Sequence, residues 1–315
     1  MVQISIIIAA YNAESTIAET INSVLTQTFS NFELIIINDG STDNTEQIIL
    51  SFFDTRIIYF LQENKGQSAA NNFGLSKVNG DYIKFFDADD VMNSTHIEAQ
   101  FEKIKFSKTN LASCKWGRFY NGDLVNTLFV SELVWKDLAT LDWLKISLSQ
   151  RHDMMGGWLW LIPKEIIVKA GGWDERLSLN NDFEFSVRML LCAEKVLFAD
   201  NAILYYRTGG VNTLAQSTSV DSYNAAYLSN FLGCTHLLAT ENSKALRRLC
   251  ANRFQGWVFA IYPDYLDIVE KFERQIKIWG GSDIKIQGGN TFVLFSKIVG
   301  WKTAKRIKLF FYRYR

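Results

Sequence analysis

The first half of the chain alternates short apolar runs with stretches of helical periodicity. Four apolar runs have the length of buried strands, over residues 4–9, 33–37, 56–60 and 81–86. Apolar side chains recur at helical spacing between these runs, over residues 13–25, 41–52 and 67–75. This alternation of strand and helix predicts a parallel sheet with helices on both faces.

The pattern changes in the second half. Residues 110–162 are mixed, and residues 195–206 predict two short strands. Helices are expected near residues 137–149, 164–170 and 182–191. From about residue 220 onward the periodicity is helical, which predicts a helical extension after the α/β part of the chain.

Small polar residues follow each of the four predicted strands. They are Ala10-Tyr11-Asn12, Asn38-Asp39-Gly40-Ser41, Glu63-Asn64-Lys65-Gly66 and Asp87-Ala88-Asp89-Asp90. Ligands of open α/β sheets bind beyond the carboxyl ends of the strands. We therefore expect a nucleotide to lie along this edge of the sheet.

Three carboxylates stand together in Asp87-Ala88-Asp89-Asp90. They would repel one another without a cation between them, and Mg²⁺ or Mn²⁺ prefers such oxygen ligands. Phosphate oxygens commonly fill the remaining positions around such a metal, so the motif favours a metal-assisted site for a phosphate ester or nucleotide sugar. A turn or helix cap without a ligand is the alternative, because aspartate is common in both.

The composition is that of an ordinary globular protein. The chain has 315 residues, of which 48% are hydrophobic and 21% charged, and its formal net charge is zero, which argues against nucleic acid as a partner. Its four cysteines lie far apart and lack zinc-site spacing, so reduced thiols in a cytoplasmic protein are expected. No apolar segment has the length of a membrane span.

Six motifs, taken in order, resemble the family 2 inverting glycosyltransferases, which have the GT-A fold. They are Ile6 to Asn12, Ile37 to Asp43, Asn64-Lys65-Gly66 with Ala70 to Gly74, Phe86 to Asp90, Gly171 to Glu175, and Asn181 to Glu184. The resemblance covers residues 1–215. It implies a GT-A domain over 1–215, with a mixed, mostly parallel sheet flanked by helices, and a helical extension over 216–315.

The resemblance also implies roles for single residues. Asp39 matches the acid that binds the base, typically uracil, and Tyr11 lies in the same base-contacting loop. Asp87 and Asp89 match the D-x-D motif, which binds the ribose and the Mn²⁺ or Mg²⁺ ion, and Asp182 matches the catalytic base. The implied donor-binding set is Ala9, Tyr11, Asn12, Asp39, Gly40, Lys65, Asn71, Asp87, Ala88, Asp89 and Arg207.

Most of these roles have a structural alternative. The segment around Asp39 is also a good turn sequence, Tyr11 can pack on the sheet edge, and Asp182 can offset a helix dipole. The family would use these residues to move a sugar, expected to come from a UDP-sugar, onto a hydroxyl of a glycan or lipid-linked glycan, in the synthesis of cell-surface polysaccharide or glycoconjugate. A non-catalytic nucleotide-sugar-binding protein and a sugar nucleotidyltransferase are the competing interpretations.

Three positions depart from the family pattern. Asn181 stands where relatives often have Glu, although Asp182 is kept. Asn71 stands where an Arg often contacts the donor, and we expect Lys65 or Arg207 to replace it. No His follows Tyr205-Tyr206-Arg207, so we expect the metal to be held through Asp89 and the donor phosphates.

Aromatic residues in the middle of the chain are candidates for acceptor binding. Trp158 and Trp173 could stack on a sugar, whereas core packing is the alternative, above all for Trp160. Arg151 and His152 precede them and could meet an anionic acceptor, with a solvated loop as the alternative for His152.

The C-terminal residues are basic and rich in aromatic side chains. Residues 297–315 contain seven Lys or Arg and no acid. Such a tail can lie in a membrane interface, so one hypothesis is peripheral contact with an anionic membrane, which would place the protein at the inner face of the plasma membrane. The alternative is a helix packed on the protein with solvated lysines.

Overall fold

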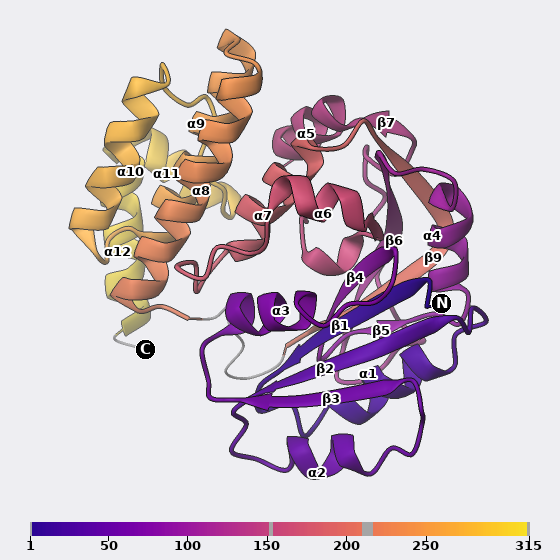
Figure 1. The fold of residues 1–315 in the computed structure, drawn as a ribbon. Helices are drawn as coiled ribbons and strands as arrows, with labels where there is room; N and C mark the ends of the chain where they lie inside the picture. Colours follow the sequence, from indigo (N-terminus) through magenta and orange to yellow (C-terminus); the bar gives the residue numbers. More distant parts are fainter. Residues whose placement is uncertain (1, 151–153, 210–216, 314–315) are drawn as a thin grey trace. The chain divides into compact units, whose positions relative to one another are not determined.

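The computed structural model describes residues 2–150, 154–209 and 217–313. Two compact units divide the chain, residues 1–218 and residues 219–315. The first unit holds a five-stranded sheet in the order β3-β2-β1-β4-β8 (Figure 1). Its strands are β1 (Ile4–Ala10), β2 (Phe32–Asp39), β3 (Ile57–Gln62), β4 (Tyr82–Asp87) and β8 (Ile162–Pro163).

The register of this sheet aligns the strand ends. Strands β1 to β4 are parallel, and only β8 pairs antiparallel, with β4. Ala9 of β1 lies opposite Ile37 of β2 and Asp87 of β4. The loops that follow these strands therefore leave the sheet at the same edge. The predicted mixed, mostly parallel sheet is confirmed.

Three helices cover this sheet. They are α1 (Ile17–Leu25), α2 (Thr45–Leu50) and α3 (Gln67–Leu75), with α3 on one face and α1 and α2 on the other (Figure 1). Helix α3 lies close to the strands because Gly74 has no side chain. A Cβ atom at Gly74 would lie 2.5 Å from Cγ2 of Ile7 in β1. The opposite end of α3 begins at the carboxyl edge of the sheet, where Gln67 donates to Asp87 at the end of β4.

A second sheet follows, in the order β5-β9-β6. It consists of β5 (Val91–Met92), β6 (Asn110–Tyr120) and β9 (Lys195–Thr208), and β7 (Leu138–Ala139) also pairs with β9. The other elements of the unit are α4 (His96–Ile104), α5 (Thr140–Ser149), the 3₁₀ turn η1 (Gly157–Leu159), α6 (Lys164–Ala170) and α7 (Asn181–Leu191).

The prediction of two short strands over residues 195–206 is wrong, because β9 is one strand. Its pairing with β6 shifts register between Cys114 and Lys115, whose partners on β9 are Ala199 and Ile203. The intervening residues bulge, and this interruption breaks the apolar pattern without ending the strand.

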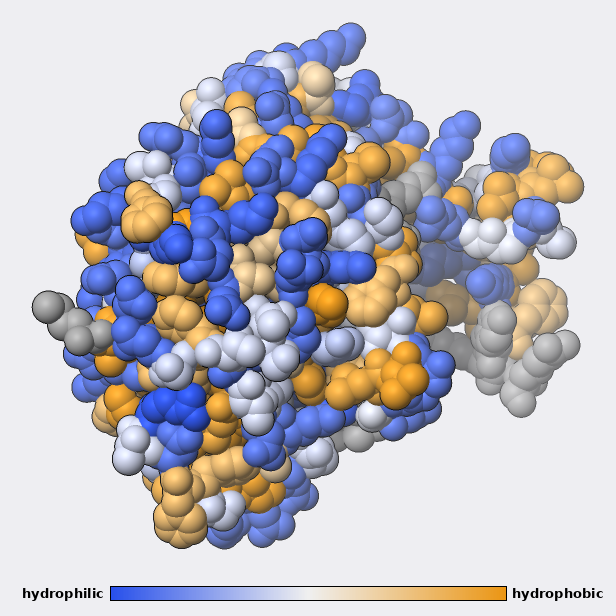
Figure 2. All heavy atoms as spheres, turned by 90° about the vertical axis from the view of Figure 1, so that its right-hand side faces the viewer, coloured by the Kyte–Doolittle hydropathy of each residue, from blue (hydrophilic) through white to orange (hydrophobic). Residues whose placement is uncertain are grey.

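The core of the first unit is mostly aliphatic and aromatic, but it contains a lysine. Isoleucines of β1 and β2 are fully buried. At the surface, the face of the molecule in Figure 2 shows hydrophobic side chains in groups among hydrophilic ones. Lys84 of β4 is also buried. Its Nζ donates to Oε1 of Gln100 at 3.0 Å and to the Trp158 carbonyl at 2.8 Å, and burial lowers its pKa to about 8. Lys84 therefore ties the segment around η1 to the centre of the sheet.

The second unit is helical. It consists of α8 (Val220–Thr240), α9 (Lys244–Ile261), α10 (Leu266–Ile278), α11 (Asn290–Val299) and α12 (Trp301–Arg313). Ser219 and Ser243 cap α8 and α9 by accepting hydrogen bonds from backbone amides of the first turn. The rings of Phe254 and Phe272, 5.0 Å apart, lie in its core. Among the described residues, no helix combines the length and the apolar character needed to cross a bilayer.

Candidate active site

The loops after β1 and β2 are joined by hydrogen bonds. Asn12 has a positive φ of 48°, its backbone amide donates to Oγ of Ser41 at 3.0 Å, and its Oδ1 accepts from the Thr42 amide at 2.8 Å. Tyr11, between Ala10 and Asn12, is 51% exposed. The structure therefore holds the Tyr11 backbone in place while its ring remains open to solvent, as stacking on a ligand would require.

Asp39 organises the loop after β3. Its Oδ1 accepts from Nε2 of Gln62 at 2.6 Å and from the Lys65 amide at 2.9 Å, and its Oδ2 accepts from the Gly66 amide at 2.9 Å. Each carboxylate oxygen has two lone pairs, so Oδ2 retains room for one more donor, such as the imide N–H of a base. Gly40 allows the loop after β3 to come this close to β2, because a Cβ at residue 40 would lie 2.8 Å from the Asn64 amide nitrogen.

Three carboxylates meet at the end of β4. Asp87, Asp89 and Asp90 each offer an oxygen, and these oxygens lie within 4.8 Å of one another. Oδ2 of Asp90 is buried and has no hydrogen-bond partner among the residues that the structure describes. A divalent cation would give this atom a partner and would offset the repulsion among the three acids, so the donor set fits Mg²⁺ or Mn²⁺. Asp90, which the D-x-D motif does not include, is therefore a further candidate ligand.

The pKa values support this fit. Burial, followed by the charges of Asp182 and Asp89, raises the pKa of Asp87 well above its usual value. Burial, followed by the charges of Asp89 and Asp87, does the same for the pKa of Asp90. Burial also raises the pKa of Asp89, although Arg207 opposes this. The carboxylates are thus short of positive charge, which a metal ion would supply.

Residues 87–90 form what we call the aspartate loop. Helix α1 and strand β9 hold this loop from two sides. Thr16, which precedes α1, and Thr20 in its first turn donate their hydroxyls to the Ala88 carbonyl at 3.0 and 3.1 Å. Arg207 of β9 donates its backbone amide to Oδ1 of Asp90 at 2.9 Å and its Nε to the Asp89 carbonyl at 2.6 Å. The Arg207 guanidinium also pairs with Glu19 of α1. Arg207 therefore positions the aspartate loop, a role that the sequence did not reveal.

Asp182 lies at the start of α7, beside this cluster. Its Oδ1 accepts from the Gly157 amide at 2.8 Å. Burial raises its pKa to about 6, and the hydrogen bond from Gly157 opposes the increase. Its charge also acts on Asp87. A carboxylate with a pKa near neutrality is well suited to accept a proton from a hydroxyl.

Two amide side chains connect α3 with Asp87 and with Asp182. Gln67, the first residue of α3, donates to Oδ1 of Asp87 at 3.1 Å and accepts from Nδ2 of Asn181 at 3.1 Å. Oδ1 of Asn181 in turn accepts the backbone amide of Asp182 at 3.1 Å. Asn181, the position where relatives often have Glu, therefore helps to place Asp182. No sequence signal pointed to Gln67, because its partners are distant along the chain.

Asn72 of α3 anchors the segment before α7. Its Oδ1 accepts from the Trp173 amide at 2.8 Å, and its Nδ2 donates to the Trp173 carbonyl at 2.9 Å and to Oε1 of Glu175 at 2.8 Å. This explains why an amide residue lies in the motif Ala70 to Gly74. The neighbouring Asn71 is buried in α3, whereas the side chain of Lys65 is exposed.

Trp158 and Trp173 are buried in the core of the first unit. They are 2% and 5% exposed, and Trp173 stacks on Phe185 with ring centroids 4.0 Å apart. The structure therefore gives them the core-packing role, because neither ring has a face open to a sugar. A Cβ at Gly157 would lie 3.0 Å from the Trp173 ring, so the indole packs directly under the residue that binds Asp182. Arg151 and His152, the candidates for meeting an anionic acceptor, lie outside the described residues.

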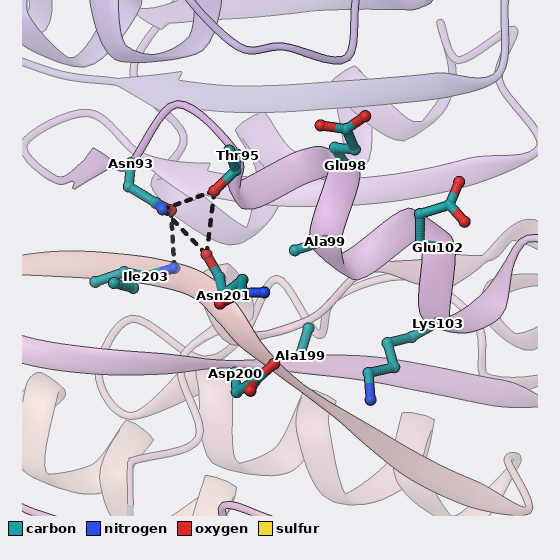
Figure 3. A pocket seen from close by; sticks show the side chains of 10 residues that line it. All are labelled: Asn93, Thr95, Glu98, Ala99, Glu102, Lys103, Ala199, Asp200, Asn201 and Ile203. Carbon is teal, nitrogen blue, oxygen red and sulfur yellow. Dashed lines mark hydrogen bonds between the residues drawn. The ribbon is translucent and has the colours of Figure 1, made fainter.

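A hollow in the first unit lies elsewhere, and none of these acids lines it. It has a volume of about 720 Å³ and lies between α4 and β9 (Figure 3). Asn93 at its rim donates to the Asn201 carbonyl at 3.0 Å and accepts from the Ile203 amide at 2.9 Å. These bonds attach β9 to the start of α4, so the polar groups serve the fold.

Comparison with solved structures defines the fold. S. aureus TarS, residues 1–349, crystallised with UDP-GlcNAc, aligns with a TM-score of 0.71 at 18% identity, over 96% of this chain and 90% of that one. The fold is therefore the GT-A fold, with helices following at the C-terminal end. Residues 5–155 match the family model described as Glycosyl transferase family 2.

Sequence relatives define the family. The uncharacterized glycosyltransferase RT0329 of Rickettsia typhi is 30% identical over 235 residues, 73% of this chain and 71% of that protein. Glycosyltransferase GlyG of Streptococcus pneumoniae serotype 4 is 30% identical over 220 residues, 66% of this chain and 71% of that protein. GlyA of the same organism is 37% identical over 121 residues, 38% of this chain and only 17% of GlyA. The chain belongs to glycosyl transferase family 2.

Proposed function

We propose that this protein is an inverting glycosyltransferase that moves a sugar from a UDP-sugar to a hydroxyl of a glycan or lipid-linked glycan. The observation that carries the proposal is Asp182, a partly buried carboxylate whose pKa is raised to about 6, beside the three aspartates at the end of β4. A base and a site for a charged leaving group thus stand together. The complex of TarS with UDP-GlcNAc supports a UDP-sugar as the donor class.

The chain's own residues suggest the order of events. Asp39 and Tyr11 bind the base, and the loops after β1, β2 and β4 hold the sugar nucleotide along the edge of the sheet. Asp182 takes the proton of the acceptor hydroxyl as the hydroxyl oxygen attacks the anomeric carbon of the donor sugar. The bond between this carbon and the nucleoside diphosphate breaks on the opposite face. Gly157 holds the Asp182 carboxylate in position.

The aspartates provide the place for a metal ion. Asp87, Asp89 and Asp90 would hold Mn²⁺ or Mg²⁺, which when bound neutralises charge on the leaving diphosphate. Polysaccharide or glycoconjugate synthesis is the process that such a transfer would serve.

Donor hydrolysis and Asp182→Asn test the proposal. The purified protein is incubated with Mn²⁺ and a panel of UDP- and GDP-sugars, and release of the nucleoside diphosphate is measured with and without glycan acceptors. We expect turnover with a UDP-sugar. Asp182→Asn should bind UDP as the wild type does and lose transfer by roughly a hundredfold or more, because the base is gone.

The same measurements separate the competing functions. UDP binding by titration calorimetry without turnover of any sugar nucleotide would favour a non-catalytic binding protein. Formation of a sugar nucleotide from a nucleoside triphosphate and a sugar phosphate would favour a nucleotidyltransferase. Unchanged transfer in Asp182→Asn would remove Asp182 from the role of base.

A further inference from the structure

Helix α11 is apolar but buries none of its side chains. Six of its ten residues are Phe, Val, Leu or Ile, and no residue of the helix is buried. Leu294 and Ile298, one turn apart, are 63% and 76% exposed. A short helix gains most of its stability by packing its apolar face, and no other part of the described chain covers this one.

Helix α12 has two different sides. On one side Trp301 packs against the rings of Phe259 and Tyr262 at 4.9 and 5.2 Å, and Lys305 donates to the Phe259 carbonyl at 2.5 Å. On the other side Ile307, Phe310 and Phe311 recur at helical spacing and are exposed, Phe311 by 66%. With Arg306 these three side chains line a shallow hollow of about 420 Å³. The first side fixes α12 to α9, which leaves the second side outward.

Charge is distributed unevenly along the chain. Residues 290–315 hold seven Lys or Arg and no acid, whereas residues 1–289 hold 26 basic and 33 acidic residues, a net charge of −7. Lys302 pairs with Glu273 of α10 at 2.6 Å. Lys297 and Arg306 are exposed beside the apolar residues, and the Arg306 guanidinium also lies over the Tyr262 ring, 5.2 Å from its centroid. Basic residues next to exposed apolar ones match a surface that is anionic outside and apolar beneath, which is the surface of an acidic lipid bilayer.

We propose that α11 and α12 form a docking surface for an anionic membrane. Two apolar groups enter the boundary between headgroups and acyl chains, Leu294, Phe295 and Ile298 from α11 and Ile307, Phe310 and Phe311 from α12. The basic residues meet the acidic headgroups. The proposal concerns the second unit and does not depend on the transfer reaction.

Vesicle flotation of the full chain tests the docking surface. Vesicles of phosphatidylcholine with phosphatidylglycerol should carry the wild type upward, and vesicles of phosphatidylcholine alone should carry roughly tenfold less. Phe310→Ser with Phe311→Ser should lower binding to the acidic vesicles by at least roughly tenfold, because two apolar side chains are lost from the boundary. Leu294→Ser with Ile298→Ser should act in the same direction.

Ile278→Ser is the matched control, since Ile278 is an exposed apolar residue at the end of α10 and lies outside the docking surface. It should bind vesicles as the wild type does, and circular dichroism should show all variants to be folded. Equal flotation of the wild type and both double variants would overturn the proposal. So would light scattering that shows a dimer disrupted by these substitutions without any vesicle binding, because the surface would then belong to a second copy of the chain.

Discussion

In the proposed function, acid–base chemistry depends on Asp182. Its pKa of about 6 arises from burial and is kept from rising further by the Gly157 amide. A base must be ionised to accept a proton, so kcat/KM should be constant above pH ~7 and fall about tenfold per pH unit below pH ~6. The measurement is the initial rate of transfer between pH 4.5 and 8.5 at saturating Mn²⁺. A profile that stays flat through pH ~6 would contradict this role.

The same carboxylate should lower stability. Its pKa is raised from 3.8 in the unfolded chain to about 6 in the fold, so the folded state is penalised where Asp182 is ionised, above pH ~6, and the penalty fades as the pH falls toward 3.8. Asp182→Asn keeps an acceptor for the Gly157 amide and should raise the free energy of unfolding at pH 7.5 by up to about 3 kcal/mol. A variant that loses transfer yet gains stability shows that its fold is intact.

At the scale of elements, α3 links the aspartates at the end of β4 with the segment before α7. Asn72→Ala removes three hydrogen bonds to Trp173 and Glu175, which should lower the free energy of unfolding by about 1–3 kcal/mol, and transfer should fall because α7 carries Asp182. Urea unfolding and the transfer rate measure the two effects.

Asn22→Ala provides the comparison for Asn72→Ala. The Asn22 side chain donates to the Ala18 carbonyl within its own helix and is exposed. Its replacement should change the free energy of unfolding by less than about 0.5 kcal/mol. Equal effects of the two substitutions would mean that the contact between α3 and residues 173–175 does not contribute measurably to the free energy of unfolding.

At the scale of the whole molecule, metal and nucleotide should act together. The aspartate loop is held by α1 and β9, so a ligand there should stabilise elements that are far apart in the sequence. Mn²⁺ with UDP at a hundredfold excess over the dissociation constant should stabilise the fold by about 2.7 kcal/mol, seen as a higher melting temperature that EDTA reverses. Asp89→Asn should largely abolish the increase.

Asp142→Asn tests whether the effect is specific to the cluster, because Asp142 is an exposed acid in the first turn of α5. It should respond to Mn²⁺ and UDP as the wild type does. The same increase in melting temperature in Asp89→Asn would show that the metal binds elsewhere.

The sequence by itself determined the sheet and its functional edge. Apolar runs of strand length, separated by amphipathic helices, leave few arrangements other than a parallel sheet, and such a sheet brings Asp39 and Asp87 to one edge. Tertiary structure decided how that edge is completed. The hydrogen bond from Gly157 to Asp182, the contacts of Asn72 with Trp173, and the burial of Trp158 all join segments that are distant along the chain. Periodicity reports only which face of an element is apolar, so these pairings become visible only when the elements are packed together.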